Sequence, residues 1–269
     1  MDALILRLRG PLMAFGDVAV DEIRPTDLLP GLSEMTGLIA NALGWTFQDV
    51  EKLQRLQERL RLASREDRAG APLRDYQTAR LSSEDALWRT DGIVAERGGG
   101  SKGEFTVQRY RHYRADAAVT ALIALEPADE APALEEIRDA LRHPARPLFI
   151  GRIGCPPSQP LCFEPEGREI IHTDSLKEAI MHIPPRPPLG ARTKREPASW
   201  NKALVEWPLT PAEALSVHGD DSVHVIERCD CRNWVANTHG GRRYVWRDTT
   251  AQHSAMPVDS GKEGTPVEP

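Results

Sequence analysis

The stretch ALILRLRGP (3–11) decides how the chain begins to fold. Leucine occupies every second position from 4 to 8, while Arg7 and Arg9 fall in the alternate register. A period of two is typical of a strand with one face in the core. Gly10–Pro11 ends the strand. We therefore predict a half-buried strand whose second face is open and positively charged.

Apolar spacing predicts the elements that follow. Ser33 stands at the N-cap position of a segment with helical spacing, and Gly44 stands where that helix would stop. The run ADAAVTALIALEP (115–127) suits a central strand buried on both faces. In chain order we expect a helix over 33–43, a helix over 49–60, a strand over 59–67, the strand over 115–127 and a helix between Pro132 and Pro144.

Two successive strand–helix–strand units predict an α+β fold with a ferredoxin-like, RRM-like core. The polar stretch 79–114 lacks sustained apolar periodicity and contains GGGSKGE (98–104), so we expect a protruding β-hairpin thumb. The expected domains are a core over 1–78 and 115–185, the thumb over 79–114, a small C-terminal β-rich extension over 186–250 and a disordered tail over 251–269.

Composition limits the functional classes. The 269 residues contain no run of about 18 apolar residues. The N-terminus lacks the apolar core and cleavage site of a signal peptide, so we expect a cytoplasmic protein with no membrane partner. The four cysteines lack the C-x2-C spacing of common zinc modules. We expect reduced thiols, no metal and no cofactor.

Positive charge is local. The net charge is -6, whereas free nucleic-acid binders are usually basic. Arginine nevertheless gathers in three stretches, QRYRHYR (108–114), ARTKR (191–195) and GGRRYVWR (240–247). A subunit that meets RNA inside a larger assembly needs only such a local basic surface.

The stretch FTVQRYRHYR (105–114) is the strongest RNA-binding candidate. On a strand, Arg109 and Arg111 share one face, and Tyr110 and His112 share the other. Arginines interleaved with tyrosines offer phosphate neutralisation together with base stacking, the two needs of single-stranded RNA binding. A solvated edge ribbon is the alternative.

Four further stretches are weaker candidates. Ser33 and Thr36 follow a loop that enters a helix N-terminus, where anions bind; plain helix capping is the alternative. RDYQT (74–78) can stack on and hydrogen-bond to unpaired bases, unless Tyr76 is a core ring. RPLFIGRIGCP (146–156) reads as a short buried strand followed by a glycine loop with Arg152, which either meets a phosphate or is a surface arginine on a turn. GPLMAFGD (10–17) is either a close-approach loop or an ordinary turn.

No convincing catalytic set is present. The motifs G-x-S-x-G, H-E-x-x-H and GxxxxGK[ST] are absent. His112, next to Tyr113 and near Lys102, could act in metal-free RNA cleavage. A solvated or RNA-contacting histidine is the alternative, and we expect no catalytic residue.

Several of these stretches, in this order, resemble the CasD family, the fifth of the Cas families. They are LILRLRGPLMAFG, RPTDLLPGLSEMTGLIANALGW, LRDYQT, YRHYRADAAVTALIAL and RPLFIGRIGCPPSQPL, within residues 4–162. The sequence departs from the family pattern at Phe15, where tryptophan is usual, and in LPGLSEMTG, where the threonine after proline is missing.

The resemblance implies a non-enzymatic subunit of type I-E CRISPR Cascade in antiviral defence. Such RAMP subunits grip the 5′ handle of the crRNA, cap the filament of backbone subunits and touch the large subunit that reads the PAM, so that target DNA is met indirectly. By position, the RNA-binding residues implied are Arg24, Ser33, Thr36, Arg74, Tyr76, Gln77, Arg109, Tyr110, Arg111, His112 and Arg152. Two other functions stay open: a metal-independent endoribonuclease that processes CRISPR repeat RNA, and a protein-only assembly scaffold.

Overall fold

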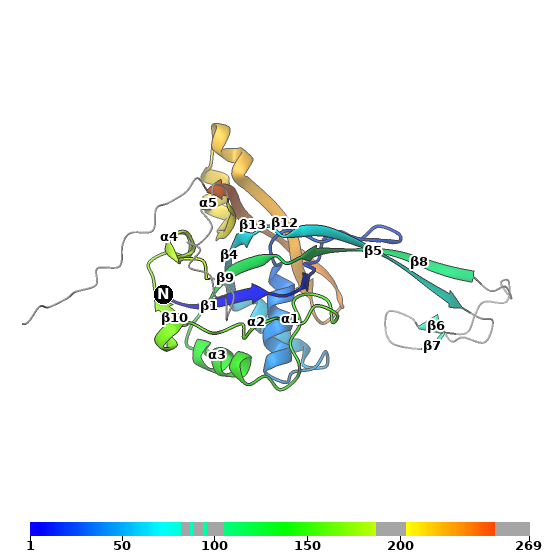
Figure 1. Ribbon diagram of the computed structural model, residues 1–269. Helices are drawn as coiled ribbons and strands as arrows, with labels where there is room; N and C mark the ends of the chain where they lie inside the picture. Colours follow the sequence, from blue (N-terminus) through cyan, green and yellow to red (C-terminus); the bar gives the residue numbers. More distant parts are fainter. Residues whose placement is uncertain (82–86, 89–93, 96–104, 187–202, 251–269) are drawn as a thin grey trace, which may run out of the picture.

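A seven-stranded antiparallel sheet forms the centre of the computed structural model, which describes residues 1–81, 87–88, 94–95, 105–186 and 203–250 (Figure 1). The strand order is β10-β1-β9-β4-β11-β13-β12. The strands are β1 (Asp2–Arg9), β4 (Leu60–Arg68), β9 (Ala118–Leu125), β10 (Ile170–His172), β11 (Ala203–Leu209), β12 (Val225–Asn233) and β13 (Thr238–Thr250). The C-terminal strands β11 to β13 thus extend the same sheet that the N-terminal half begins.

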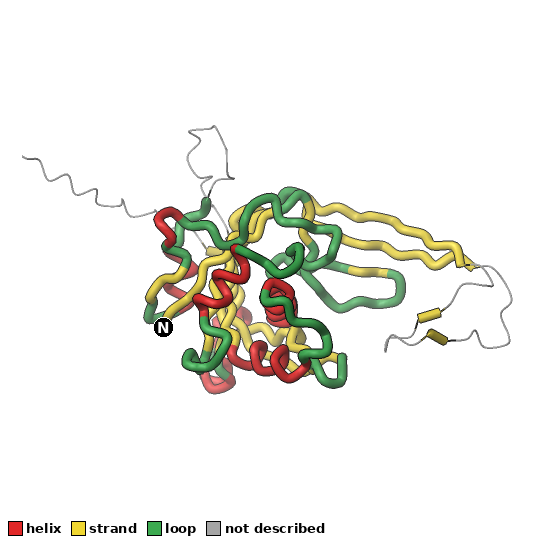
Figure 2. The backbone as a smooth tube through the Cα atoms, turned by 90° about the horizontal axis from the view of Figure 1, so that it is seen from below, coloured by secondary structure: helices red, strands yellow, loops and turns green. Residues whose placement is uncertain are grey.

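Helices cover both faces of this sheet. Three helices pack on one face, α1 (Leu32–Ala42), α2 (Val50–Arg59) and α3 (Leu134–Arg142), and their apolar stripes bury a core with the leucines of β1 (Figures 1 and 2). The opposite face packs against α4 (Leu176–His182), which encloses a second core with Ile5 and Leu122. The short α-helix α5 (Pro211–Ser216) and two 3₁₀ turns, Pro165–Gly167 and Gly219–His224, complete the helices of the described residues.

The prediction of an open, charged face on the first strand is wrong. Arg7 and Arg9 are only 2% and 8% exposed. The Arg7 guanidinium pairs with Glu164 at 2.6 Å and donates to the Thr120 hydroxyl at 2.7 Å, while that of Arg9 donates to the carbonyl oxygen of Arg186. Segments from far along the chain therefore cover the face and supply the polar partners that buried arginines require.

A long β-ribbon projects from the core (Figures 1 and 2). Strands β5 (Ala71–Leu81) and β8 (Phe105–Ala115) pair antiparallel along their whole length, and β2 (Leu12–Met13) and β3 (Ile23–Arg24) add to β8 near the core. The short strands β6 (Leu87–Trp88) and β7 (Val94–Ala95) pair with each other. The hairpin therefore starts at Ala71, earlier than the predicted position 79, because the whole of RDYQT (74–78) pairs with β8.

The structure also corrects the predicted N-cap of the first helix and the predicted strand in 146–156. Gly31, not Ser33, is the N-cap of α1. No strand forms over 146–150; the backbone there is irregular and turns at Gly151, whose φ is +83°. A Cβ at Gly151 would lie 1.7 Å from the Ala14 carbonyl oxygen, so only glycine fits this close approach. The stretch GGGSKGE (98–104) of the predicted thumb and the predicted tail (251–269) lie outside the described residues.

Candidate nucleic-acid interface

One face of the projecting ribbon is aromatic. Cross-strand pairing places Tyr76 opposite Tyr110 and Arg74 opposite His112, so these four side chains share a face. The two tyrosine rings lie 5.0 Å apart at 32°, and the Arg74 guanidinium lies 5.5 Å from the centre of the Tyr110 ring. Tyr76 is 51% exposed, so the reading of Tyr76 as a core ring is wrong. An aromatic pair with one exposed ring, flanked by arginine, has the chemistry that stacks unpaired bases.

The opposite face of the ribbon carries arginines. Gln77 pairs across the strands with Arg109, Asp75 pairs with Arg111, and β3 places Arg24 beside Arg111. Among the described residues the Arg111 guanidinium has no hydrogen bond or ion pair. Arg24, Arg109 and Arg111 outnumber the single carboxylate of Asp75 on this face, so the surface is positively charged and can meet phosphates.

The other predicted arginine, Arg152, fastens the ribbon to the core. Its guanidinium donates to the carbonyl oxygens of His112 at 2.8 Å and Arg24 at 2.9 Å, and it lies 4.8 Å from the centre of the Tyr113 ring. Arg152 therefore holds β3 and β8 in place, because its donors are directed at their backbone.

The N-terminus of α1 is already occupied by carboxylates. Glu34 accepts hydrogen bonds from the backbone N–H groups of Gly16 and Gly31, and Asp230 accepts one from the Leu32 N–H at 3.0 Å. Burial raises the pKa of Glu34 to about 7, against the opposing effect of these backbone donors. A phosphate at this helix end would meet negative charge and few free donors.

The two hydroxyl groups predicted to contact RNA at this helix, those of Ser33 and Thr36, differ in their exposure to solvent. The Thr36 side chain is 0% exposed and its hydroxyl donates to the Leu32 carbonyl oxygen at 2.9 Å. The prediction that Thr36 contacts RNA is therefore wrong for this structure, because the residue lies on the buried stripe of α1. Ser33 is partly exposed and lines a 510 Å³ cleft between α1 and β12. None of the predicted RNA-binding residues of the ribbon lines this cleft.

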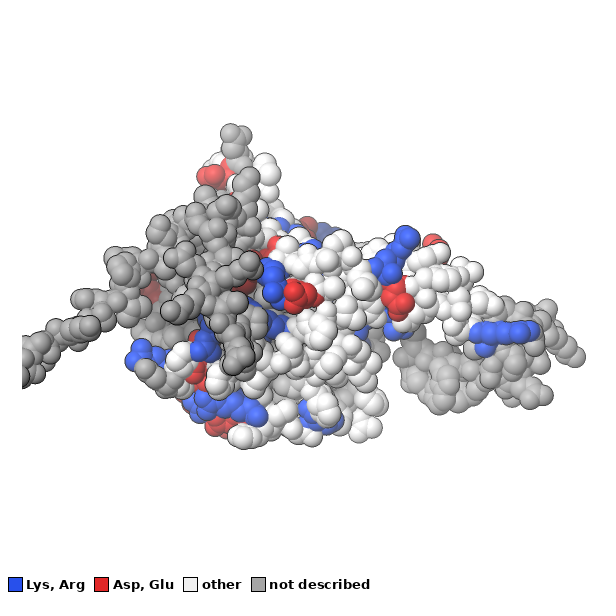
Figure 3. Space-filling view, viewed as in Figure 1, with Lys and Arg blue, Asp and Glu red and all other residues white. Residues whose placement is uncertain are grey.

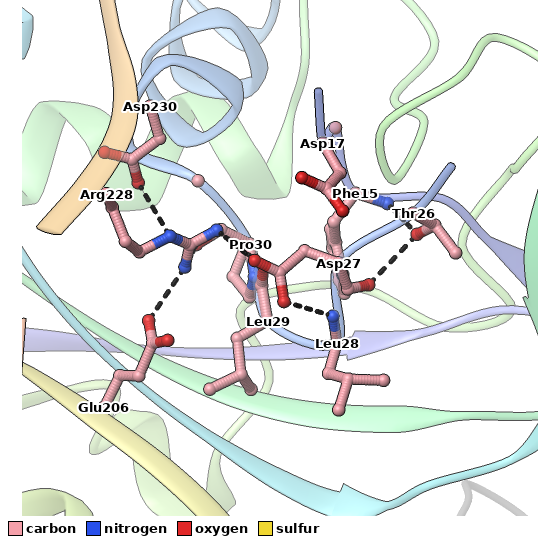
Figure 4. A network of polar contacts seen from close by, with 12 residues as sticks. Phe15, Asp17, Thr26, Asp27, Leu28, Leu29, Pro30, Glu206, Arg228 and Asp230 are labelled. Carbon is pink, nitrogen blue, oxygen red and sulfur yellow. Dashed lines mark hydrogen bonds and ion pairs between the residues drawn. The ribbon is translucent and has the colours of Figure 1, made fainter. Parts of the chain in front are cut away.

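The basic C-terminal stretch, 240–247, is engaged within the fold. Buried Arg228 forms ion pairs with Asp27 and Glu206, both at 2.8 Å (Figure 4). Arg243 pairs with Asp230 at 2.7 Å, and Arg247 pairs with Glu206 and Asp27. Arg228 and Arg247 therefore hold the β12–β13 hairpin against Asp27 in the loop before α1, whereas arginines reach the open surface of the ribbon (Figure 3). The stretch 191–195 lies outside the described residues.

Cross-strand pairing thus gathers eight of the eleven predicted site residues on one ribbon. They are Arg24, Arg74, Tyr76, Gln77, Arg109, Tyr110, Arg111 and His112. Sequence reasoning missed the loop 16–23, whose Glu22 carbonyl oxygen accepts a hydrogen bond from the Tyr110 N–H at 2.9 Å. No sequence signal for this contact exists, since it depends on the parallel pairing of β3 with β8.

No group of three or more histidine, cysteine or acidic side chains in the described part of the chain is arranged to hold a metal ion. No described helix has the length and apolar character to cross a membrane. The four cysteines are free thiols, and burial raises the pKa of Cys162 to about 12.

Comparison with known proteins identifies the family. The model of a family described as CRISPR-associated protein (Cas_Cas5) matches residues 3–246. The chain belongs to the Cas_Cas5 family. It is also 33% identical over 166 residues to the CRISPR system Cascade subunit CasD of Escherichia coli strain K12, a match covering 59% of this chain and 68% of CasD. The resemblance to the CasD family is therefore confirmed.

Solved structures support the fold of this Cas_Cas5 protein. A chain of a structure titled CRISPR RNA-guided surveillance complex superposes with a TM-score of 0.59 at 22% identity, over 93% of this chain and 90% of that one. A structure titled crystal structure of Cas protein superposes with a TM-score of 0.54 at 21% identity, over 93% and 95% of the two chains. The mixed α/β architecture with its large antiparallel sheet is thus shared with Cas proteins.

Proposed function

We propose that this Cas_Cas5 protein is a non-catalytic subunit of a type I-E CRISPR Cascade complex that binds the 5′ handle of the crRNA. In this proposal the core is ferredoxin-like and RRM-like, and the β5–β8 ribbon is the thumb that reaches the RNA. The named relative is itself a Cascade subunit, and one similar structure is an RNA-guided complex.

The observation that carries the proposal is the two-sided chemistry of the ribbon. The Tyr76–Tyr110 pair offers an exposed ring for a base, and Arg111 on the other face, which has no ion pair among the described residues, offers a positive charge for a phosphate. An aromatic ring can stack on any base, and an arginine can pair with a phosphate in any RNA sequence. The ribbon therefore suits a splayed single strand better than a regular duplex.

Within the complex, the subunit caps the filament of backbone subunits beside the large PAM-reading subunit, and target DNA is met through these neighbours. This placement is carried over from the CasD relationship. The shape of the chain supports it, because a ribbon that projects from a closed core can contact RNA while the core contacts protein (Figure 1).

Direct binding of a labelled RNA handle tests the RNA-binding part. Wild-type chain should bind the handle with an affinity that falls as salt rises, and Arg109→Ala with Arg111→Ala should flatten that salt dependence. An unchanged salt dependence would count against the arginine face as an RNA contact.

The endoribonuclease alternative rests on His112, which lies opposite Arg74 on the aromatic face. Incubating the purified chain with a CRISPR repeat hairpin in EDTA should leave the RNA intact. Clean cleavage at one site, abolished by His112→Ala, would instead make the protein a metal-independent nuclease. The protein-only scaffold would be supported by an assembled complex that retains RNA equally well after all ribbon changes.

A further inference from the structure

The loop between β2 and β3, residues 16–23, exposes aliphatic side chains beside the base of the ribbon (Figure 1). Val18 is 68% exposed, Val20 58% and Ile23 44%. Ile153, 86% exposed, lies on the adjacent turn, whose Arg152 donates to the backbone of the residue after Ile23. Single exposed aliphatic residues are ordinary, but three within six positions form a patch.

Hydrogen bonds hold both ends of this loop. At its start, the Phe15 N–H donates to the Thr26 hydroxyl at 2.8 Å, and Glu34 accepts from the N–H of Gly16. At its end, the Ile23 N–H donates to the Val20 carbonyl oxygen at 2.9 Å. Together with the Tyr110–Glu22 bond to β8, these contacts anchor both ends of the loop that carries the valines before any partner arrives. A preordered surface loses little conformational freedom on binding.

The charge of the loop indicates the class of partner. Asp17, Asp21 and Glu22 lie among the exposed aliphatic residues, and residues 16–23 contain no lysine or arginine. Negative charge repels a phosphate backbone, so this loop is unsuited to RNA although it adjoins the arginine face of the ribbon. Exposed aliphatic side chains within an acidic border match a protein surface with an apolar socket and a basic rim.

We propose that loop 16–23 docks into such a socket on a neighbouring protein subunit while the ribbon holds RNA. The inference rests on the proposed function, since it assigns the loop to assembly of the same complex. The protein contact and the RNA contact would then lie side by side, because the docked loop and Tyr110 share a backbone hydrogen bond.

The test measures affinity for protein and for RNA separately. Wild-type chain and variants are titrated against the other Cascade protein subunits, expressed together without crRNA, and against the free RNA handle. Val18→Ser with Val20→Ser should weaken binding to the protein subunits by at least about tenfold, because two apolar contacts are lost. It should leave RNA affinity unchanged. The matched control, Val223→Ser with Val235→Ser, removes valines that are 80% and 70% exposed elsewhere and should change neither.

Reversing one charge separates protein docking from RNA contact. Glu22→Lys should weaken protein binding, since it opposes a basic rim, whereas a loop that faced RNA would bind the handle more tightly after the change. Unchanged protein affinity in the valine variant, or no binding of wild-type chain to the RNA-free subunits, would overturn the docking inference. Either result leaves the RNA-binding proposal intact, because that proposal stands on the ribbon variants alone.

Discussion

Replacing Tyr76 by alanine distinguishes a base-stacking ring from a structural one. The side chain is 51% exposed, and its main aromatic contact is the Tyr110 ring at 5.0 Å. An aromatic pair contributes about 0.5–1.5 kcal/mol, so the free energy of unfolding should fall by no more than that. A buried aromatic would lose about 3–5 kcal/mol on the same truncation. We therefore expect a nearly unchanged melting temperature.

The affinity for RNA should change far more. Stacking of one unpaired base is worth about 1–3 kcal/mol, so Tyr76→Ala and Tyr110→Ala should each weaken binding of the 5′ handle roughly 5- to 150-fold. Tyr76→Phe keeps the ring and should be mild unless the hydroxyl reads a base edge. Neither tyrosine carries charge, so the slope of affinity against salt should stay that of the wild type.

The assay is fluorescence anisotropy of a labelled handle at several salt concentrations, with thermal unfolding of the same samples. Phe47→Ala is the matched control, because Phe47 is 84% exposed and lies in the loop between α1 and α2, outside the ribbon strands. Handle affinity that stays within twofold of wild type in both tyrosine variants would refute the stacking argument. A large loss of melting temperature at Tyr76 would show instead that the ring supports the fold.

Three further changes test what charged side chains contribute to RNA binding and to stability. Arg109→Ala with Arg111→Ala should reduce the salt slope of handle binding by about 1–2 units, whereas Arg242→Ala, which removes an exposed ion pair with Glu227, should not. Arg228→Met should lower the free energy of unfolding by about 3–5 kcal/mol in denaturant titrations, because it strands buried carboxylates; a loss below 1 kcal/mol would contradict this. Folding raises the pKa of Glu34 from 4.5 to about 7. Between these two pH values the folded protein keeps the carboxyl proton and the unfolded chain loses it, so the free energy of unfolding falls as the pH rises from 4.5 to about 7. Relative to Glu34→Gln, wild type should lose about 2–3 kcal/mol between pH 5 and pH 8, and a pH-independent difference would refute the assignment.

Local patterns in the sequence determined much of the fold. The alternating leucines of β1 and the helical stripes of α1 to α3 each identified an element by its own period. The continuous apolar run of β9 identified a strand that is buried on both faces. Gly44 ended α1 as predicted, with a φ of +81° that favours glycine. The interleaved arginines and tyrosines of 105–114 lie on the ribbon strand β8.

Only the tertiary structure decided which arginines and tyrosines remain available to bind a partner. Arg7 and Arg9 look like an open basic face in the sequence, but distant segments bury and pair them. The arginines of 240–247 look as basic as those of the ribbon, yet acidic partners some 13 to 220 positions away in sequence bind several of them. Such partners leave no local pattern, since a carboxylate that neutralises an arginine needs only to be near in space. Tyr76 and Tyr110 likewise form one platform because the register of β5 and β8 places them opposite each other.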